Sequence, residues 1–495
     1  MLHPSEALAR YRIQGLLSEA EHARLVARLR SLQRARRAAK RTAAIPSLDQ
    51  TSGDSRHDPR HVPRAPRWAG HCRATMRRRQ PSLPRRRQAE AFAVAHSKEA
   101  TVRSAPAHEE ETVSTELRVS TIELFFDLVF VFAVTQLTGL LAGEPTMAGL
   151  GRVVLIFGNL WWIYGGYAWL TNAVPPQASR LRLLMLVGMG GFLVVALAIP
   201  TAFAGGGVLF GVGYLLVTMV HTGMFLTSSQ ESAVRAMRRL GPVNALTALL
   251  LLAAGFTDGV LRWTLWAAAF GLHWISPFFT AVPGFPIRAA HFVERHGLIV
   301  LIGLGESIVA VGIGMAGQGL GADRVVVAAL GLTVVAALWW LYFDGEDEQA
   351  ERVLDAATLE RTSWLALYGF GYGFLPVLGG IIVFAAGVKN AVGHYGEPPA
   401  VSTTWLLAAG VATYLVGLAW FRQLLGIGPV GARLLIAGVV LSTATVGLVV
   451  SPGAQLAVLA AIVAGGVLAE SAWEHREGRK GSPAPADGLA RGAVM

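Results

Sequence analysis

Residue types that carry much of the chemistry of soluble enzymes are scarce in this sequence of 495 residues. The single cysteine, Cys72, excludes a disulfide framework, a thiolate zinc site and a cysteine-ligated cluster within one chain. Charged residues make up only 15% of the chain, whereas soluble globular proteins contain about 25%. No Walker A, HExxH or GxSxG signature is present. We therefore expect neither a soluble enzyme nor a bound cofactor or metal.

Apolar residues, in contrast, are in large excess and make up 53% of the chain. The net charge of +11 belongs to residues 1–115, which hold 23 Lys and Arg against 11 Asp and Glu. The remaining 380 residues hold 20 basic and 21 acidic residues, so they are almost neutral. They suffice for about a dozen membrane spans of about 20 residues. The composition predicts a membrane protein whose basic character does not indicate a nucleic-acid partner.

Residues 1–115 are predicted to form a basic, largely disordered cytoplasmic extension with one amphipathic helix at 5–41. Leu25, Leu29 and Leu32 recur at helical intervals, and residues 45–104 are rich in Pro, Arg, His and Ser. Such an arm is attracted to anionic lipid head groups. The alternative is a start codon assigned too early. No apolar segment typical of a signal peptide follows the first basic residues.

Twelve apolar stretches follow, and they predict an all-α, polytopic fold. They cover roughly 121–142, 150–172, 181–203, 206–228, 241–258, 260–283, 296–316, 324–344, 362–387, 402–421, 433–450 and 453–471. If the N-terminus is cytoplasmic, the inner loops and the tail at 473–495 carry 15 Lys and Arg, and the outer loops carry 4. The positive-inside rule therefore predicts cytoplasmic termini and residence in the cell (inner) membrane.

Short internal similarities suggest that the spans form a duplicated unit. Residues 160–164 read LWWIY and residues 338–342 read LWWLY, an offset of 178, and the GFL of 191–193 recurs at 373–375. An even number of spans in each unit predicts two parallel six-helix halves. Chance similarity among apolar helices is the alternative. The predicted halves are residues 116–288 and 289–472.

Glu306 is the most informative polar residue because it falls near the middle of the predicted seventh span. It follows His296 by ten residues, about 15 Å of helix, which places it near the midplane of a ~30 Å hydrocarbon core. A carboxylate at that depth is costly unless it is protonated, paired or in contact with water. We therefore predict a proton- or cation-coupling acid. The alternative is a neutral carboxyl group that only joins two helices by a hydrogen bond.

Two more carboxylates, Glu123 and Asp127, lie four residues apart on one face of the predicted first span. They repel each other unless one is protonated or a cation lies between them, and Arg118 is a nearby candidate. Glu294 and His296 precede the seventh span, but their spacing matches no defined metal site. An interfacial salt-bridge cluster is the alternative to a functional role. The transport or coupling candidates are Glu306, Glu123, Asp127, Glu294, His296 and Arg295.

Three segments carry a resemblance to a known family. Residues 120–133 read STIELFFDLVFVFA, residues 291–308 contain HFVERHGL and LGESI, and residues 339–344 read WWLYFD. They resemble motifs of the bacterial low-temperature-requirement protein A (LtrA) family, over about residues 117–450. The resemblance implies a multi-pass membrane protein, named from a requirement for growth in the cold, and it assigns no biochemical activity. The basic extension and the absence of a His within 372–376 depart from the family pattern.

Two classes of function remain open at this point. The first is a secondary transporter or channel-like protein with Glu306 near its pathway. The second is a non-transporting membrane protein, sensory or structural, involved in cold adaptation, whose buried acids only specify helix packing. We do not expect an enzyme, because the predicted spans contain no obvious nucleophile–base pair.

Overall fold

The computed structural model describes residues 119–280, 285–316, 319, 321–394 and 400–481, with side chains described as far as residue 472. All of these residues belong to one compact unit, residues 107–495. Within the described residues every regular element is a helix, as the all-α prediction requires. The predicted basic extension and its amphipathic helix lie outside the described residues.

Among the described residues, ten helical segments are long and apolar enough to cross a bilayer. In chain order they are α3 (Thr121–Gly143), α4 (Met147–Ala173), α5 (Ser179–Ala198) with η1 (Ile199–Thr201), α6 (Gly207–Leu226), α10 (Ala289–Met315), α11 (Ala322–Phe343) with α12 (Glu346–Ala356), α13 (Leu359–Leu365) with η2 (Ala366–Tyr372) and α14 (Phe374–Gly393), α15 (Val401–Leu425), α16 (Gly431–Ser442) with α17 (Ala444–Val449), and α18 (Pro452–Gly481). The fold is therefore that of a multi-pass membrane protein.

The predicted fifth and sixth spans, 241–258 and 260–283, are not among these ten. They coincide with the second half of α7 (Glu231–Ala254) and with α8 (Gly259–Ile275), which is followed by the single turn α9 (Pro277–Thr280). The first turns of α7 are polar and basic, and α8 has only 17 residues. Both helices nevertheless pack beside α6 and α4 as full members of the helical unit.

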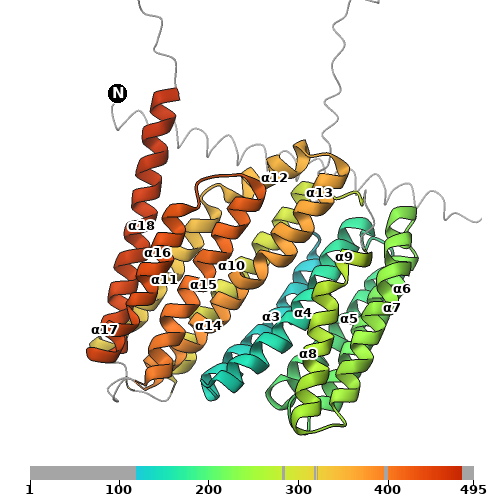
Figure 1. Ribbon diagram of the computed structural model, residues 1–495, viewed down its shortest axis with the longest axis horizontal. Coiled ribbons are helices and arrows are strands. Elements are labelled where there is room, and N and C mark those ends of the chain that lie inside the picture. Colours follow the sequence, from blue (N-terminus) through green and yellow to red (C-terminus); the bar gives the residue numbers. More distant parts are fainter. Residues whose placement is uncertain (1–118, 281–284, 317–318, 320, 395–399, 482–495) are drawn as a thin grey trace, which may run out of the picture. The chain divides into compact units, whose positions relative to one another are not determined.

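Three helices, α3, α10 and α14, pack against one another at the centre of the described unit (Figure 1). From α3, neighbouring helices follow in the order α5, α6, α7 and α8 on one side. From α14, they follow in the order α15 and α16, and α18 packs on α11. The helix α4 lies against α3 and α8, so it connects the central helices with one flank.

The most extensive helix pair, α14 with α15, is joined through glycines. A Cβ atom on Gly410 would lie 2.4 Å from the backbone nitrogen of Phe384, and one on Gly380 would lie 2.6 Å from that of Tyr414. Small residues let helix backbones approach closely, which is the main source of helix association in lipid. These glycines therefore anchor α15 to the central helix α14.

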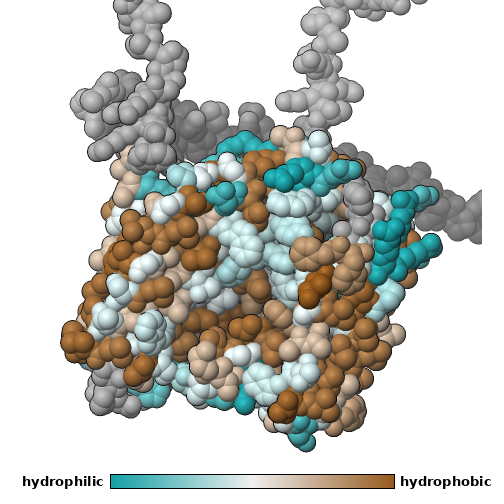
Figure 2. Space-filling model, in the orientation of Figure 1, coloured by the Kyte–Doolittle hydropathy of each residue, from teal (hydrophilic) through white to brown (hydrophobic). Residues whose placement is uncertain are grey.

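Polar residues gather at one end of the described unit, over α12 and α13, whereas apolar residues cover most of the face below them (Figure 2). The turn into α12 uses Gly345 at φ +98°, a conformation that side chains disfavour. Behind it the buried Glu346 pairs with Arg422 (2.6 Å to Nε) and with Arg433, and Glu470 pairs with both arginines. This closed set of two acids and two arginines ties α12 and α18 to α15 and α16.

Candidate functional site

A buried ionic cluster, formed by Glu123, Asp127 and Arg295, lies at the interface of α3, α4 and α10. The Arg295 guanidinium is wholly buried and donates to Glu123 Oε1 (3.1 Å) and Asp127 Oδ1 (3.2 Å). It also donates to the Thr171 hydroxyl of α4. The ring of Phe126 lies under the guanidinium at 5.5 Å. Three of the six predicted candidates are thus in direct contact.

Local chemistry at the start of α3 explains why Glu123 is held in this position. The Ser120 backbone N–H and hydroxyl both donate to Glu123 Oε2, at 2.9 and 2.6 Å. This is the capping-box interaction, which satisfies donors at the helix N-terminus. The remaining oxygen, Oε1, faces α10 and accepts from His291 Nε2 (3.0 Å) as well as from Arg295.

A second layer of contacts extends the cluster toward α4. The His291 ring contacts the Asn172 amide, Nδ1 to Nδ2, at 3.3 Å. That amide also bonds both the carbonyl and the N–H of Arg288, at 3.0 Å each. The N-terminus of α10 is therefore fastened to the end of α4. The polar residues Tyr164, Thr171 and Asn172 had no distinguishing signal in the sequence beyond being polar groups in an apolar run.

The pairing in the cluster is incomplete. Two carboxylates face one guanidinium, and Asp127 Oδ2 and Arg295 Nε have no hydrogen-bond partner in the described part of the chain. Asp127 Oδ1 accepts from the Tyr164 hydroxyl at 3.0 Å in addition to Arg295. A buried acid with an unused oxygen can accept a proton or a cation at little structural cost. The cluster therefore keeps one carboxylate oxygen and one guanidinium N–H without a hydrogen bond among the described residues.

Glu306 lies on α10, eleven residues after Arg295, and forms a second polar level. It is 3% exposed, and its Oε2 accepts from the Thr135 hydroxyl of α3 at 2.5 Å. Within the described residues no basic side chain forms an ion pair with it, although Lys389 of α14 acts on it electrostatically. Other buried polar groups lie elsewhere, because His221 and His273 belong to the α6–α8 flank and Arg295 to the ionic cluster.

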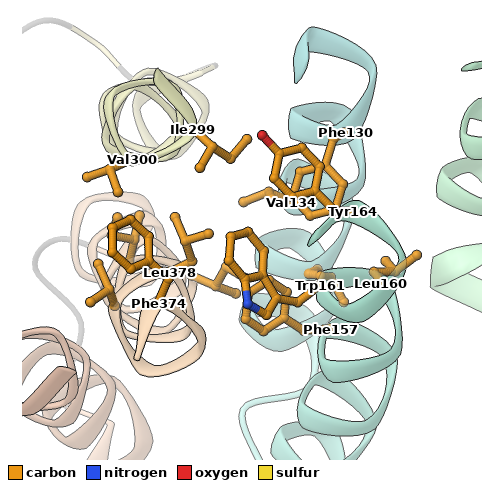
Figure 3. Close-up of a cluster of buried hydrophobic side chains, with 14 of the residues drawn as sticks. Phe130, Val134, Phe157, Leu160, Trp161, Tyr164, Ile299, Val300, Phe374 and Leu378 are labelled. Carbon is orange, nitrogen blue, oxygen red and sulfur yellow. The ribbon is translucent and has the colours of Figure 1, made fainter. Parts of the chain in front are cut away.

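An apolar layer separates the ionic cluster from Glu306. Phe130 and Val134 of α3 and Ile299 and Val300 of α10 are all buried between the two levels, and Figure 3 shows them facing residues of α4 and α14. The rise along α3 from Asp127 to Thr135 is about 12 Å, and the rise along α10 from Arg295 to Glu306 is about 16 Å, at 1.5 Å per residue. Figure 3 also shows Trp161 of α4 directed toward Leu378 of α14.

The two remaining candidates occupy different surroundings. Glu294 is exposed, accepts from the Val119 N–H at 3.1 Å and faces away from the cluster. His296 is buried, and its Nδ1 donates to the Phe292 carbonyl at 2.8 Å. Its ring packs among aromatic rings, including Phe370 at 4.9 Å. His296 therefore forms part of the apolar packing beside the cluster rather than its hydrogen-bond network.

Acidic side chains also line a cavity of about 330 Å³ beside α12. Glu294, Asp347, Glu348 and Glu351 contribute to its wall. Within the described residues no three metal-capable side chains are close enough together to hold an ion.

The helical unit and its buried polar cluster define a multi-pass helical membrane protein. The family model described as "Bacterial low temperature requirement A protein (LtrA)" matches residues 118–468, so the chain belongs to the LtrA family, as the motifs indicated. "Uncharacterized protein RA0937" of Rhizobium meliloti (strain 1021) is 29% identical over 330 residues, covering 62% of this chain and 78% of that protein. No solved structure matches the chain.

Proposed function

We propose that this LtrA-family protein is a secondary transporter or channel-like protein in which buried acids hold a proton or a cation near the bilayer midplane. The observation that carries the proposal is Glu306, a buried acid whose only hydrogen bond within the described residues comes from the Thr135 hydroxyl. Ionisable groups inside a membrane most often belong to substrate or ion pathways. A carboxyl group that forms no ion pair within the described residues is suited to binding and releasing a proton.

The arrangement of two polar levels around an apolar layer supports the same proposal. A transporter must prevent its two compartments from being connected at the same time, and a dry layer between polar sites provides this barrier. Phe130, Val134, Ile299 and Val300 supply such a layer. We infer that α10 moves relative to α3 during transport, because both levels and the layer lie along this helix pair.

We further propose that the chain is built from two parallel six-helix halves, with α7 and α8 completing twelve spans. The packing order α3–α5–α6–α7 in the first half matches α10–α14–α15–α16 in the second. Tyr214 Oη of α6 donates to the Asn159 carbonyl of α4 at 2.9 Å, and Tyr414 Oη of α15 donates to the Leu338 carbonyl of α11 at 2.8 Å. The two acceptors are separated by almost the offset of the LWWIY and LWWLY segments.

The proposal includes the setting of the protein. We place it in the cell (inner) membrane with both termini in the cytoplasm, where the basic arm of residues 1–115 contacts anionic lipid head groups. We propose no enzymatic activity, because the polar groups of the cluster are engaged with one another rather than gathered at an open cleft.

Flux measurements in liposomes test the role of Glu306. Purified wild-type protein should carry a proton- or cation-linked current or pH change, and Glu306→Gln should abolish it while the protein remains folded. Glutamine keeps the shape and one hydrogen bond but cannot take up a proton. The exposed acid Glu231 of α7 offers a matched control, since Glu231→Gln should leave the flux unchanged. Undiminished flux in Glu306→Gln would refute the coupling role.

The second candidate function is a non-transporting membrane protein, sensory or structural, that acts in cold adaptation. The favouring observation is the charge balance of a second buried set, in which two acids, Glu346 and Glu470, pair with two arginines, Arg422 and Arg433, an arrangement that suits a packing role. This candidate predicts no flux from wild-type liposomes across a broad screen of ions. It also predicts that Glu306→Gln is silent, whereas Glu306→Leu destabilises by leaving the Thr135 hydroxyl unpaired.

A further inference from the structure

A cavity of about 460 Å³ lies outside the α3–α10 interface, between α4, α6, α7, α8, α9, α13 and η2. Its size lies within the usual range for small-molecule sites. Nine of its 24 lining residues are aromatic. The aromatic lining residues are Trp161, Trp162, Trp169, Phe225, Trp274, Phe285, Trp364, Tyr368 and Tyr372. On the face that carries α9 and α13, Figure 2 shows pale, weakly polar residues between apolar margins.

The backbone around the cavity has features that are common in ligand sites. The segment η2 is a π-helix, a rare form that occurs frequently at functional sites, and it lines the cavity through Tyr368, Gly371 and Tyr372. Gly165 of α4 also lines the cavity, and no atom lies within 4 Å of the position that its Cβ would occupy. Since this glycine has no side chain, a planar molecule can approach the backbone closely there.

A buried amide supplies a fixed hydrogen-bond donor in this wall. Asn244 of α7 is 2% exposed, and its Oδ1 accepts from the indole N–H of Trp162 at 3.2 Å. If the Asn244 amide were flipped, its NH₂ group would face the indole N–H, donor against donor, so the indole fixes the orientation of the amide. Its Nδ2 group has no hydrogen-bond partner in the described part of the chain. Both Nδ2 donors are therefore available to an acceptor in the cavity.

A further polar group of the wall lacks a partner. The Nε1 donor of Trp274 is buried and unpaired within the described residues. Buried polar groups without partners are rare because each costs about 1–3 kcal/mol. Free donors on Asn244 and Trp274 around one cavity indicate that a bound molecule supplies the missing hydrogen bonds.

The charge around the cavity is balanced and gives no preference for anions or for cations. Among the described residues the only charged lining residue is Glu360, at the exposed rim. The Arg361 guanidinium beside it stacks on the Trp364 ring at 4.2 Å, so the rim carries one charge of each sign. A neutral cavity with aromatic walls favours an uncharged, planar ligand.

We propose that this cavity binds a neutral, membrane-soluble aromatic ring compound that bears a carbonyl-type oxygen, with Asn244 Nδ2 as the donor to that oxygen. The aromatic walls stack on the ring system, and the lipid phase delivers the molecule. The inference goes beyond the proposed function, since it concerns a separate site and holds whether or not the protein carries flux. Failure of the flux experiment therefore leaves it intact.

Calorimetric titration of the full-length protein in detergent micelles tests the proposal with two matched probes. The probes are 2,3-dimethyl-1,4-naphthoquinone and 2,3-dimethylnaphthalene, which share a ring system and differ in the carbonyl groups. Wild-type protein should bind the quinone about tenfold more tightly than the hydrocarbon. Asn244→Leu should weaken quinone binding about three- to tenfold, the range of one hydrogen bond, and leave hydrocarbon binding unchanged.

Two other variants keep the test decisive. Asn390→Leu makes the same change at a half-buried asparagine of α14 that donates to the Ala142 carbonyl, away from the cavity, and should alter neither affinity. If Asn244→Leu does not fold, Trp162→Phe keeps an aromatic wall but releases the amide, and it should lower the preference for the quinone. Equal affinity of wild type for both probes, no binding of either, or tighter binding of benzyltrimethylammonium would each overturn the proposal.

Discussion

Removal of the Arg295 guanidinium is the most informative perturbation of the buried ionic cluster. Arg295→Met keeps a long apolar stem but deletes the donors to Glu123 (3.1 Å) and Asp127 (3.2 Å). Both acids are at most 2% exposed, so neither can recover its lost interaction from water. Breaking a buried ion pair by removing one partner costs about 3–5 kcal/mol. We expect a loss of that size in the free energy of unfolding.

The structure also predicts how this loss divides between the two acids. Glu123 retains donors from Ser120 and His291 after the substitution. Asp127 retains only the Tyr164 hydroxyl, and its Oδ2 is already unpaired. Most of the loss therefore falls on Asp127. Adding Asp127→Asn to Arg295→Met should recover about half of the loss, whereas Glu123→Gln should recover less.

Reversible unfolding in mixed detergent micelles, followed by tryptophan fluorescence, measures these free energies. Arg235→Met provides the control, because Arg235 is 61% exposed and lies 3.8 Å from an exposed Glu231. Such a surface pair contributes about 0–1 kcal/mol. The reasoning is refuted if Arg295→Met costs no more than Arg235→Met, or if Glu123→Gln restores more stability than Asp127→Asn.

Three further predictions concern other parts of the chain. Thr135→Val should lower the free energy of unfolding by about 0.5–1.5 kcal/mol in the same assay, because it removes the hydroxyl that donates to Glu306. Reporter fusions after Gly206 and after Gly393 should report the outside of the cell and a fusion near Arg238 the inside; an inside signal after Gly206 would contradict the proposed topology. Deletion of residues 1–100 should leave membrane insertion intact, measured by membrane fractionation, since arginines of the remaining chain set the orientation.

The positions of most membrane-crossing helices could be predicted from the sequence, because every segment that crosses lipid must be apolar along its own length. The predicted spans at 121–142 and 402–421 correspond to α3 and α15 within a few residues. The start of α7 shows the limit of this reasoning. A helix continues wherever its backbone hydrogen bonds form, so α7 begins at Glu231, well before the apolar stretch that begins near residue 241.

The partners of the buried acids could not be predicted in the same way. The pairing of Glu123 with Asp127 on one face follows from helix geometry, but the sequence pointed to Arg118 as the nearby cation. The structure places Arg295 there, 172 residues from Glu123, because α10 packs against α3. Hydropathy describes the contact of each helix with lipid and contains no information about which polar faces meet.

The sequence by itself determined that this chain is a helical membrane protein of the LtrA family, and it identified the acids that are costly to bury. Only the tertiary structure decided that Glu306 accepts a hydrogen bond from Thr135, and that an apolar layer separates this pair from the ionic cluster. It also decided that Trp162 orients the Asn244 amide, which lies 82 residues away in the chain. The physical reason is that the bilayer acts on each helix separately, along the sequence. Hydrogen bonds and cavities arise between helices, where lateral packing brings together residues that are remote in the chain.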